Sequence, residues 1–380
     1  MHQAARSSAR RRITFVVNGT PGSAMSVRAE SFARELADGF DSSLLHRQPR
    51  KVRAVAELVR SLRALRPEAV YVLDIGYSGV VASALHALGS GCPRVVDTGD
   101  AIAALARSVG GRGRVGELLT EALEQFGLRT ADAVVVRGTF HQRLLARQGI
   151  ASTVIQDGLY VDAFLPRPAG ELRRSLGLEG VLTVGILGSS VWSERLGVAV
   201  GWELVELMRL LKGRPVKGVL IGDGSGVPVL RERCRRYGLE DRMVFIDRLP
   251  YERLPEYLGV LDVALSTQSN DVVGQVRTTG KLPLYMANGR YVLATDVGEA
   301  SLVLPEEMRV PYQGVVDPAY PARLAERVEG LLARPERLRV GASLVALARE
   351  HFEYPVLAGR VRGVLERVLL PPAQRAASRW

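Results

Sequence analysis

Short apolar runs alternate with helical patterns along most of the chain, and this alternation constrains the fold more than any other feature. Expected strands in the first half lie at 13–18, 69–73, 94–97, 133–136 and 153–156, and expected helices at 27–39, 51–65, 79–88, 115–130 and 139–148. The second half repeats the pattern, with strands at 181–187, 217–221, 244–246, 261–265 and 291–295 and helices at 193–211, 227–237, 254–259 and 281–288. Such alternation predicts parallel sheets with helices on both faces.

The chain is too long for one ordinary core, which predicts two domains. The stretch FLPRPAG at 164–170, with two prolines and a glycine, is the predicted linker. We therefore predict an α/β protein with two doubly wound, Rossmann-like domains facing a cleft, at 1–165 and 166–350. The pattern is helical from 320 onwards, and we expect residues 351–380 to form a helix that packs back on the first domain, followed by a polar tail.

Composition excludes several classes of protein. A hydrophobic fraction of 47% with 24% charged residues is typical of a globular protein, and no apolar run reaches the ~20 residues needed to span a membrane. The arginine-rich lead-in before residue 13 is not followed by a signal-peptide core. Cys92 and Cys234 lie far apart and outside any metal-type spacing, which favours a cytoplasmic protein without disulfides. The net charge of +11 favours anionic ligands.

The first predicted strand runs into a tight turn that contains Gly19 and Gly22 and leads into a helix. This order opens a doubly wound domain. The turn lacks the G-x-G-x-x-G spacing, and no acidic residue ends an obvious second strand, so we expect no dinucleotide cofactor. The turn is either purely structural or a backbone contact for an acceptor or a phosphate.

A second polar, glycine-containing loop lies between the predicted strand at 261–265 and the predicted helix at 281–288. Loops at the carboxyl end of a buried parallel strand are the usual ligand sites of such sheets. Arg277 and Lys281, together with nearby backbone N–H groups, are a predicted seat for a phosphate or diphosphate. The alternative is a solvated pair of surface charges.

Five collinear segments resemble retaining GT-B glycosyltransferases of the group often called glycosyl transferases group 1 (family 4-like). They are VLTVGILGSS at 181–190, VKGVLIGDGSG at 216–226, RMVFIDRLPYERLPEYLGVLDVALSTQ at 242–268, MANGRYVLATDVGEA at 286–300 and, upstream, VIQDGLYVDAFLP at 154–166. The resemblance implies that the second domain holds a nucleotide-diphosphate sugar (UDP- or GDP-type) and the first an acceptor. It also implies retaining, metal-independent transfer, with no cofactor.

The resemblance assigns roles residue by residue. The donor-binding candidates are Gly188, Ser189, Arg195, Gly222, Asp223, Arg248, Gly274, Gln275, Arg277, Thr278, Thr279 and Lys281. Asp271, three residues before Gly274, matches an acidic position that would hold sugar hydroxyls, and it is a catalytic candidate. Its structural alternative is a turn cap.

The chain departs from the family pattern at three positions. Ser189 stands where the family has an arginine, Leu284 where it has the glutamate that holds the ribose, and Gly99 where it has a histidine. We hypothesise that Arg277 and Lys281 replace part of the diphosphate binding lost at Ser189. Arg277→Ala should then weaken nucleotide binding by about 1.5–3 kcal/mol, and calorimetry that shows unchanged affinity would remove the hypothesis.

The first domain offers two further candidates. Asp100, in the DTGD segment at 97–100, lies near the family's donor-sugar position and is the second catalytic candidate; otherwise it caps a helix. His141, after the strand at 133–136, joins Gly19 and Gly22 as an acceptor-binding candidate; otherwise it is a packed residue. The basic amphipathic stretch at 50–66 is either a helix packed on the sheet or a surface that contacts membrane lipid.

These observations predict a glycosyltransferase that acts on a small-molecule, natural-product or lipid-linked acceptor. Two alternatives stay open. A sugar-nucleotide epimerase would need carboxylates and histidine in the cleft, and a non-catalytic nucleotide-sugar binder would explain Ser189, Gly99 and Leu284. No aromatic platform or motif indicates a nucleic-acid partner. The base, the sugar, a homodimer and peripheral membrane contact are left open by the sequence.

Overall fold

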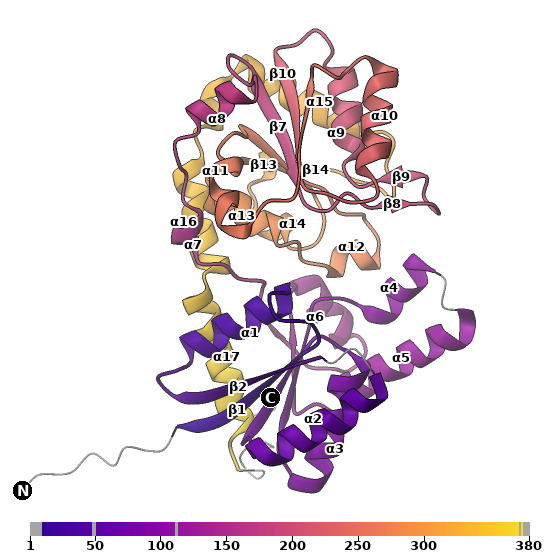
Figure 1. Cartoon of the computed structure of the whole chain (residues 1–380), viewed down its shortest axis with the longest axis vertical. Helices are drawn as coiled ribbons and strands as arrows, with labels where there is room; N and C mark the ends of the chain where they lie inside the picture. The colour runs from indigo at the N-terminus through magenta and orange to yellow at the C-terminus, as the bar shows by residue number, and fades with distance from the viewer. Residues whose placement is uncertain (1–9, 48–50, 111–112, 372–373, 375–380) are drawn as a thin grey trace, which may run out of the picture. The chain divides into compact units, whose positions relative to one another are not determined.

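A computed structural model describes residues 10–47, 51–110, 113–371 and 374, and its chain forms two compact units (Figure 1). The first unit comprises 1–157, 276–278 and 354–380, and the second comprises 158–275 and 279–353. The division falls at Asp157 rather than at residue 165, because Leu159, Val161 and Phe164 pack in the core of the second unit. The start of the basic lead-in, Arg50 and most of the predicted tail lie outside the described residues.

The first unit contains one six-stranded parallel sheet. Its strand order is β2-β1-β3-β4-β5-β6. The strands are β1 (Arg11–Val17), β2 (Phe40–His46), β3 (Ala69–Leu73), β4 (Arg94–Thr98), β5 (Ala133–Val136) and β6 (Thr153–Val154). The continuous apolar runs predicted as strands are buried throughout β3, as a sheet covered on both faces requires.

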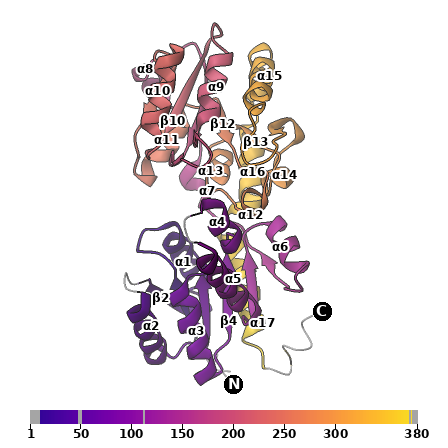
Figure 2. The ribbon, with the colours of Figure 1, turned by 90° about the vertical axis from the view of Figure 1, so that its right-hand side faces the viewer.

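Helices cover both faces of this sheet. They are α1 (Ala24–Glu35), α2 (Lys51–Leu65), α3 (Tyr77–Ser90), α4 (Ile102–Val109), α5 (Gly113–Arg129), α6 (Thr139–Ala146) and the C-terminal α17 (Tyr354–Val368). Helices α2 and α3 lie side by side (Figure 2), and α1 packs against α17. The basic amphipathic stretch is therefore a helix packed in the unit, with Leu58 and Leu62 buried.

The second unit contains a parallel sheet of the same kind, with strand order β11-β10-β7-β12-β13-β14. Its strands are β7 (Leu182–Leu187), β10 (Val216–Ile221), β11 (Met243–Ile246), β12 (Val263–Ser266), β13 (Tyr291–Thr295) and β14 (Arg309–Val310). The predicted fold class, two doubly wound α/β domains with a helical C-terminus, is confirmed.

Helices again surround this sheet. The α-helices are α7 (Val161–Phe164), α8 (Gly170–Ser175), α9 (Trp202–Leu210), α10 (Val227–Tyr237), α11 (Leu254–Leu258), α12 (Val272–Val276), α13 (Lys281–Ala287), α14 (Ala300–Val303), α15 (Tyr320–Ala333) and α16 (Gly341–Phe352). Three short 3₁₀ turns add to them: η1 (Tyr251–Arg253), η2 (Glu306–Met308) and η3 (Pro335–Leu338). Within the described ranges, no helix has the length and apolar character needed to cross a membrane.

One predicted helix is wrong. The stretch at 193–211 begins as a small antiparallel hairpin, β8 (Trp192–Ser193) and β9 (Val198–Ala199), and only α9 at its end is helical. Gly197 and Gly201 adopt left-handed φ angles of +65° and +94°. Because a residue in this conformation interrupts an α-helix, no helix can run through this stretch before α9. Arg195 therefore lies in the turn of a hairpin and not on a helix surface.

Candidate functional site

The second sheet changes its direction of winding at β7. The chain leaves β7 through α9 to β10 on one side, whereas β12 pairs with β7 on the other side. Because the connections diverge there, the loops at the carboxyl ends of β7 and β12 leave room for a ligand. The candidate donor-site residues after these strands and after β10 can be placed around this point.

Glycines bring the loops after β7 and β10 into direct backbone contact. Gly188 and Gly222 have φ angles of +133° and +140°, and a Cβ on Gly222 would overlap the carbonyl oxygen of Gly188. The N–H of Ser190 donates to the carbonyl of Asp223 at 2.7 Å. Gly188, Ser189 and Asp223 are exposed. The structure thus brings four predicted donor-site residues together in one surface with accessible backbone. We call this surface, formed by Gly188, Ser189, Gly222 and Asp223, the glycine edge.

Lys281 adds a positive charge to this edge. Its Nζ lies 3.4 Å from the position that a Cβ on Gly188 would occupy. The hydroxyl of Tyr285, one turn along α13, accepts from the N–H of Leu187 at 2.6 Å, which ties α13 to the end of β7. Burial lowers the pKa of Lys281, and the carboxyl of Glu203 opposes that shift. An ammonium beside an exposed glycine backbone is suited to an anion such as a phosphate.

Two other predicted basic residues stand apart from this group. Arg195 lies in the β8–β9 turn, Arg248 follows β11, and both are exposed. Over the described part of the chain, neither has a hydrogen bond or ion pair to Gly188 or Lys281. The family resemblance grouped them with the donor site, but the structure does not bring them into contact with Gly188 or Lys281.

Asp271 and Gln275 hold together the loop after β12. Oδ1 of Asp271 accepts from the N–H of Gly274 at 2.9 Å and from the hydroxyl of Ser269 at 2.8 Å. The side chain of Gln275 accepts from the N–H of Gly298 at 2.9 Å. A Cβ on Gly274 would collide with the carbonyl of Ser269. In this structure Asp271 therefore acts as a turn cap, and Gly274 is required by close packing. Leu284, at the position of the family's glutamate, lies in the apolar core.

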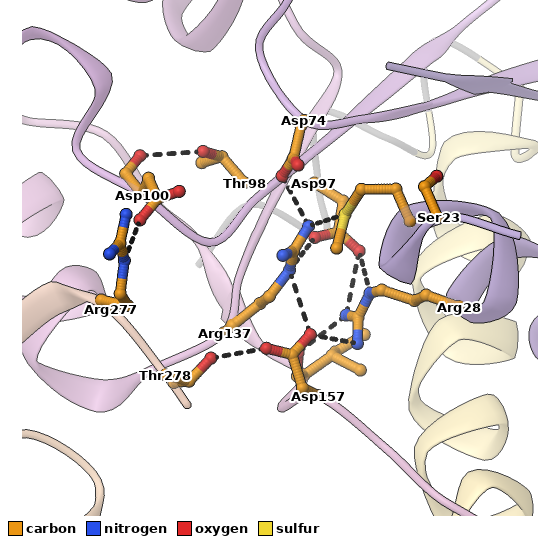
Figure 3. Close-up of polar contacts among 12 residues, drawn as sticks. Ser23, Arg28, Asp74, Asp97, Thr98, Asp100, Arg137, Asp157, Arg277 and Thr278 are labelled. Atoms are coloured by element: carbon orange, nitrogen blue, oxygen red, sulfur yellow. Dashed lines mark hydrogen bonds and ion pairs between the residues drawn. The ribbon is translucent and has the colours of Figure 1, made fainter. Parts of the chain in front are cut away.

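The segment at 276–278 belongs to the first unit by its contacts. Arg277 Nε donates to Oδ1 of Asp100 at 3.0 Å, and Thr278 Oγ1 donates to Oδ2 of Asp157 at 2.7 Å (Figure 3). Lys281 belongs to the second unit. Thr279 Oγ1 lies 3.4 Å from the hydroxyl of Ser266 in the second unit. The predicted pair is thus divided between the two units. Arg277 belongs to the first unit, where it pairs with Asp100, and Lys281 belongs to the second.

A buried charge network occupies the carboxyl end of the first sheet. Asp97, at the end of β4, is fully buried. Arg28 donates to its Oδ2 at 3.0 Å, and Arg137 donates to its Oδ1 at 3.3 Å (Figure 3). The Tyr71 hydroxyl donates to Oδ2 at 2.9 Å. Burial alone would lower the pKa of the Arg28 guanidinium, but Asp97 and the nearby Asp157 raise it. The network therefore keeps its charges in the interior of the unit.

The same arginines position neighbouring segments. Arg28 Nη2 donates to the carbonyl of Ile155 at 2.8 Å, and Arg28 also donates to the carbonyl of Gln156, so it holds the chain after β6. Arg137 Nη2 donates to Oδ1 of Asp74 at 2.6 Å. Neither Arg28 nor Arg137 was predicted from the sequence. The signal for Arg28 was its spacing before Phe32 on α1, and the signal for Arg137 was its place directly after β5.

The predicted acceptor residues lie at the carboxyl ends of β1 and β5. Gly22 is exposed with φ +76°, whereas a Cβ on Gly19 would overlap the Ser23 hydroxyl that caps α1. His141 is only 1% exposed, and its Nδ1 has no hydrogen-bond partner among the described residues. Burial lowers the pKa of His141 to about 4, with Asp100 raising it and Arg137 lowering it. His141 is therefore neutral near pH 7.

Comparison with known proteins identifies part of this architecture. Residues 182–334, all within the second unit, match the model of a family described as glycosyl transferases group 1. The 2-deoxystreptamine glucosyltransferase of Streptomyces kanamyceticus is 28% identical over an alignment of 275 residues, and the match covers 67% of this chain and 66% of that protein. This chain thus matches a little under two thirds of that relative. Both findings support a glycosyltransferase.

Solved structures share the fold over most of the chain. Anabaena HepE in complex with UDP-glucose has a TM-score of 0.73 at 18% identity, covering 93% of this chain and 99% of that one. A candidate UDP-N-acetylglucosamine 2-epimerase from Listeria monocytogenes has a TM-score of 0.63 at 14% identity, covering 94% of this chain and 96% of that one. At these identities the likeness to these two structures shows the fold alone.

Proposed function

We propose that this chain, in which residues 182–334 match the glycosyl transferases group 1 family, is a glycosyltransferase that takes its sugar from a nucleoside-diphosphate donor of the UDP or GDP type. The observation that carries the proposal is the position of Lys281 beside Gly188 at the winding switch of the second sheet. An accessible backbone with one adjacent ammonium matches the charge and shape of a sugar diphosphate.

The chemistry that we propose is transfer with retention and without a metal ion. As the bond from the sugar to the diphosphate breaks, negative charge grows on the leaving phosphate, and Lys281 with the backbone at Gly188 would stabilise it. The first unit would bind the acceptor at the carboxyl ends of β1, β4 and β5, near Gly22 and Asp100. Because the curated relative is named for 2-deoxystreptamine, we propose a small molecule as the acceptor, with a lipid-linked glycan as the alternative.

The direct test is binding followed by turnover. A thermal-shift screen with UDP, GDP and their sugar conjugates should show stabilisation, because a ligand at 100 times its Kd adds about 2.7 kcal/mol. Incubation of the bound donor with 2-deoxystreptamine and other small acceptors, with and without EDTA, then tests transfer. A chain that binds none of these nucleotides would overturn the proposal. An epimerised sugar formed without any acceptor would replace transferase with epimerase.

Lys281→Met should weaken binding of the nucleoside diphosphate by about 1.5–3 kcal/mol, because a charged hydrogen bond is lost at the phosphates. That loss is roughly a ten- to 150-fold increase in the Kd measured by calorimetry. The matched control is Lys212→Met, which removes an exposed lysine of the same unit whose Nζ donates to the carbonyl of Tyr237. Equal affinities for the two variants would exclude Lys281 from the site.

A further inference from the structure

The first turn of α9 carries a carboxyl group into the interior of the second unit. Glu203 is only 6% exposed and lies among Trp202, Leu204 and Val205, which are core residues. Its Oε2 has no hydrogen-bond partner among the described residues. Burial raises the pKa of Glu203 to about 7, against the opposite effects of backbone N–H groups and Lys281. The carboxyl is therefore close to half protonated at neutral pH.

Among the residues that the structure describes, Lys281 is the charged side chain that acts on Glu203. Tyr312, which follows β14, and Tyr320, the first residue of α15, both interact with the charge of Glu203, but burial raises the pKa of Tyr312 to about 12 and that of Tyr320 further. Both phenols are thus neutral wherever Glu203 titrates. Lys281 on α13 interacts with Glu203 electrostatically, and each favours the charged form of the other. The ionisation of Glu203 is therefore linked to the Lys281 ammonium.

The same ammonium faces the glycine edge, because Lys281 Nζ lies next to Gly188. A phosphate placed there would share Lys281 with Glu203. One positive charge would then stand between two negative charges, in a place where burial already disfavours the ionised carboxylate. The arrangement becomes favourable when Glu203 carries a proton, because Lys281 is then free to balance the phosphate.

We propose that Glu203 takes up a proton from solvent when the nucleoside-diphosphate donor binds beside Lys281, so that donor binding weakens in alkaline solution. This inference rests on the proposed function, since it needs a diphosphate at that edge. Thermodynamic linkage between proton binding and donor binding sets the sign of this pH dependence. Well below pH 7 Glu203 is already protonated and the Kd does not change with pH, whereas above pH 7 donor binding is coupled to the uptake of a proton from solvent.

The test is calorimetry with UDP-glucose, or GDP-glucose if that is the donor bound, because the phosphates of these diesters do not titrate near pH 7. Titrations at pH 7.5 in buffers of different ionisation enthalpy report the protons taken up. The wild-type chain should take up a fraction of a proton, and its Kd should rise roughly tenfold between pH 6.5 and 8.5. Glu203→Gln should bind without proton uptake and with a nearly constant Kd.

The matched control is Glu206→Gln on the same helix, where Glu206 pairs with Arg209, and this variant should keep the proton uptake of the wild type. Tight binding with no proton uptake by the wild type would overturn this inference and leave the proposed function standing. Absence of binding to every nucleotide sugar would overturn both. Should Glu203→Gln fail to fold, the buffer and pH series on the wild type still decides.

A stability measurement checks the same group without a ligand. A carboxyl whose pKa is raised in the folded state favours the protonated fold, so its ionisation reduces stability as the pH rises from 4.5, its ordinary value, to about 7. The melting temperature of the wild type should therefore fall relative to that of Glu203→Gln between pH 5 and pH 8. Parallel curves would show that Glu203 does not titrate in this range.

Discussion

Arg28→Met is expected to lower the free energy of unfolding by about 3–5 kcal/mol, since it removes one partner of a buried ion pair. Arg28 is 1% exposed and Asp97 is fully buried, so the carboxylate would lose a charged partner with no water to replace it. The carbonyls of Ile155 and Gln156 would lose their donors as well. Urea denaturation followed by circular dichroism measures the change.

The matched control is Arg107→Met on α4. Arg107 pairs with Glu121 at 3.2 Å, but both side chains are about half exposed. Water and salt screen such a pair, so its loss should cost no more than about 1 kcal/mol. A cost for Arg28→Met as small as that of the control would show that the Asp97 network does not stabilise the first unit.

Gly222→Ala should destabilise the second unit and also abolish tight donor binding. At φ +140° an alanine is strained by about 1–3 kcal/mol. Its Cβ would also overlap the carbonyl of Gly188, and relieving that overlap costs about 1–3 kcal/mol more. Because Gly188 must move away, the edge beside Lys281 changes shape. We expect the Kd for the nucleoside diphosphate to rise at least tenfold, as measured by calorimetry.

Gly213→Ala is the control that separates the effect of backbone strain from the effect of displacing Gly188. Gly213 has φ +98°, but a Cβ there meets nothing within 4 Å. This control should lose stability through backbone strain while nucleotide affinity stays unchanged. Wild-type affinity in folded Gly222→Ala would place the donor away from the loops after β7 and β10, and would contradict the proposed site.

Most of the strands were predictable because a buried parallel strand is a continuous apolar run. Strands β3, β5 and β13 have the predicted limits. Strand β2 was missed because its sequence, FDSSLLH, is polar at its centre, and the strand lies at the edge of the sheet and is only partly buried. Helices α4, α7, α8, α12 and α14 were missed as well; the last four are six residues or shorter, too short for a periodic pattern.

The candidate site was predictable where its chemistry is local. Gly188 and Gly222 end strands in glycine turns, and Lys281 begins a helix, so each is visible in a few residues of sequence. Glu203 was not predicted, because an acid between Trp202 and Leu204 has the same local pattern whether it faces solvent or the core. Only the packing of α9 against α15 shows that it is buried.

The sequence by itself determined the two series of strands and helices, and the glycine turns at the strand ends, because periodicity and backbone freedom are properties of neighbouring residues. Tertiary structure alone decided which charges meet. Arg28 and Asp97 are 69 residues apart, and Arg277 and Asp100 are 177 apart. The energy of such pairs depends on burial and distance in the folded chain, and neither quantity is present in a local pattern.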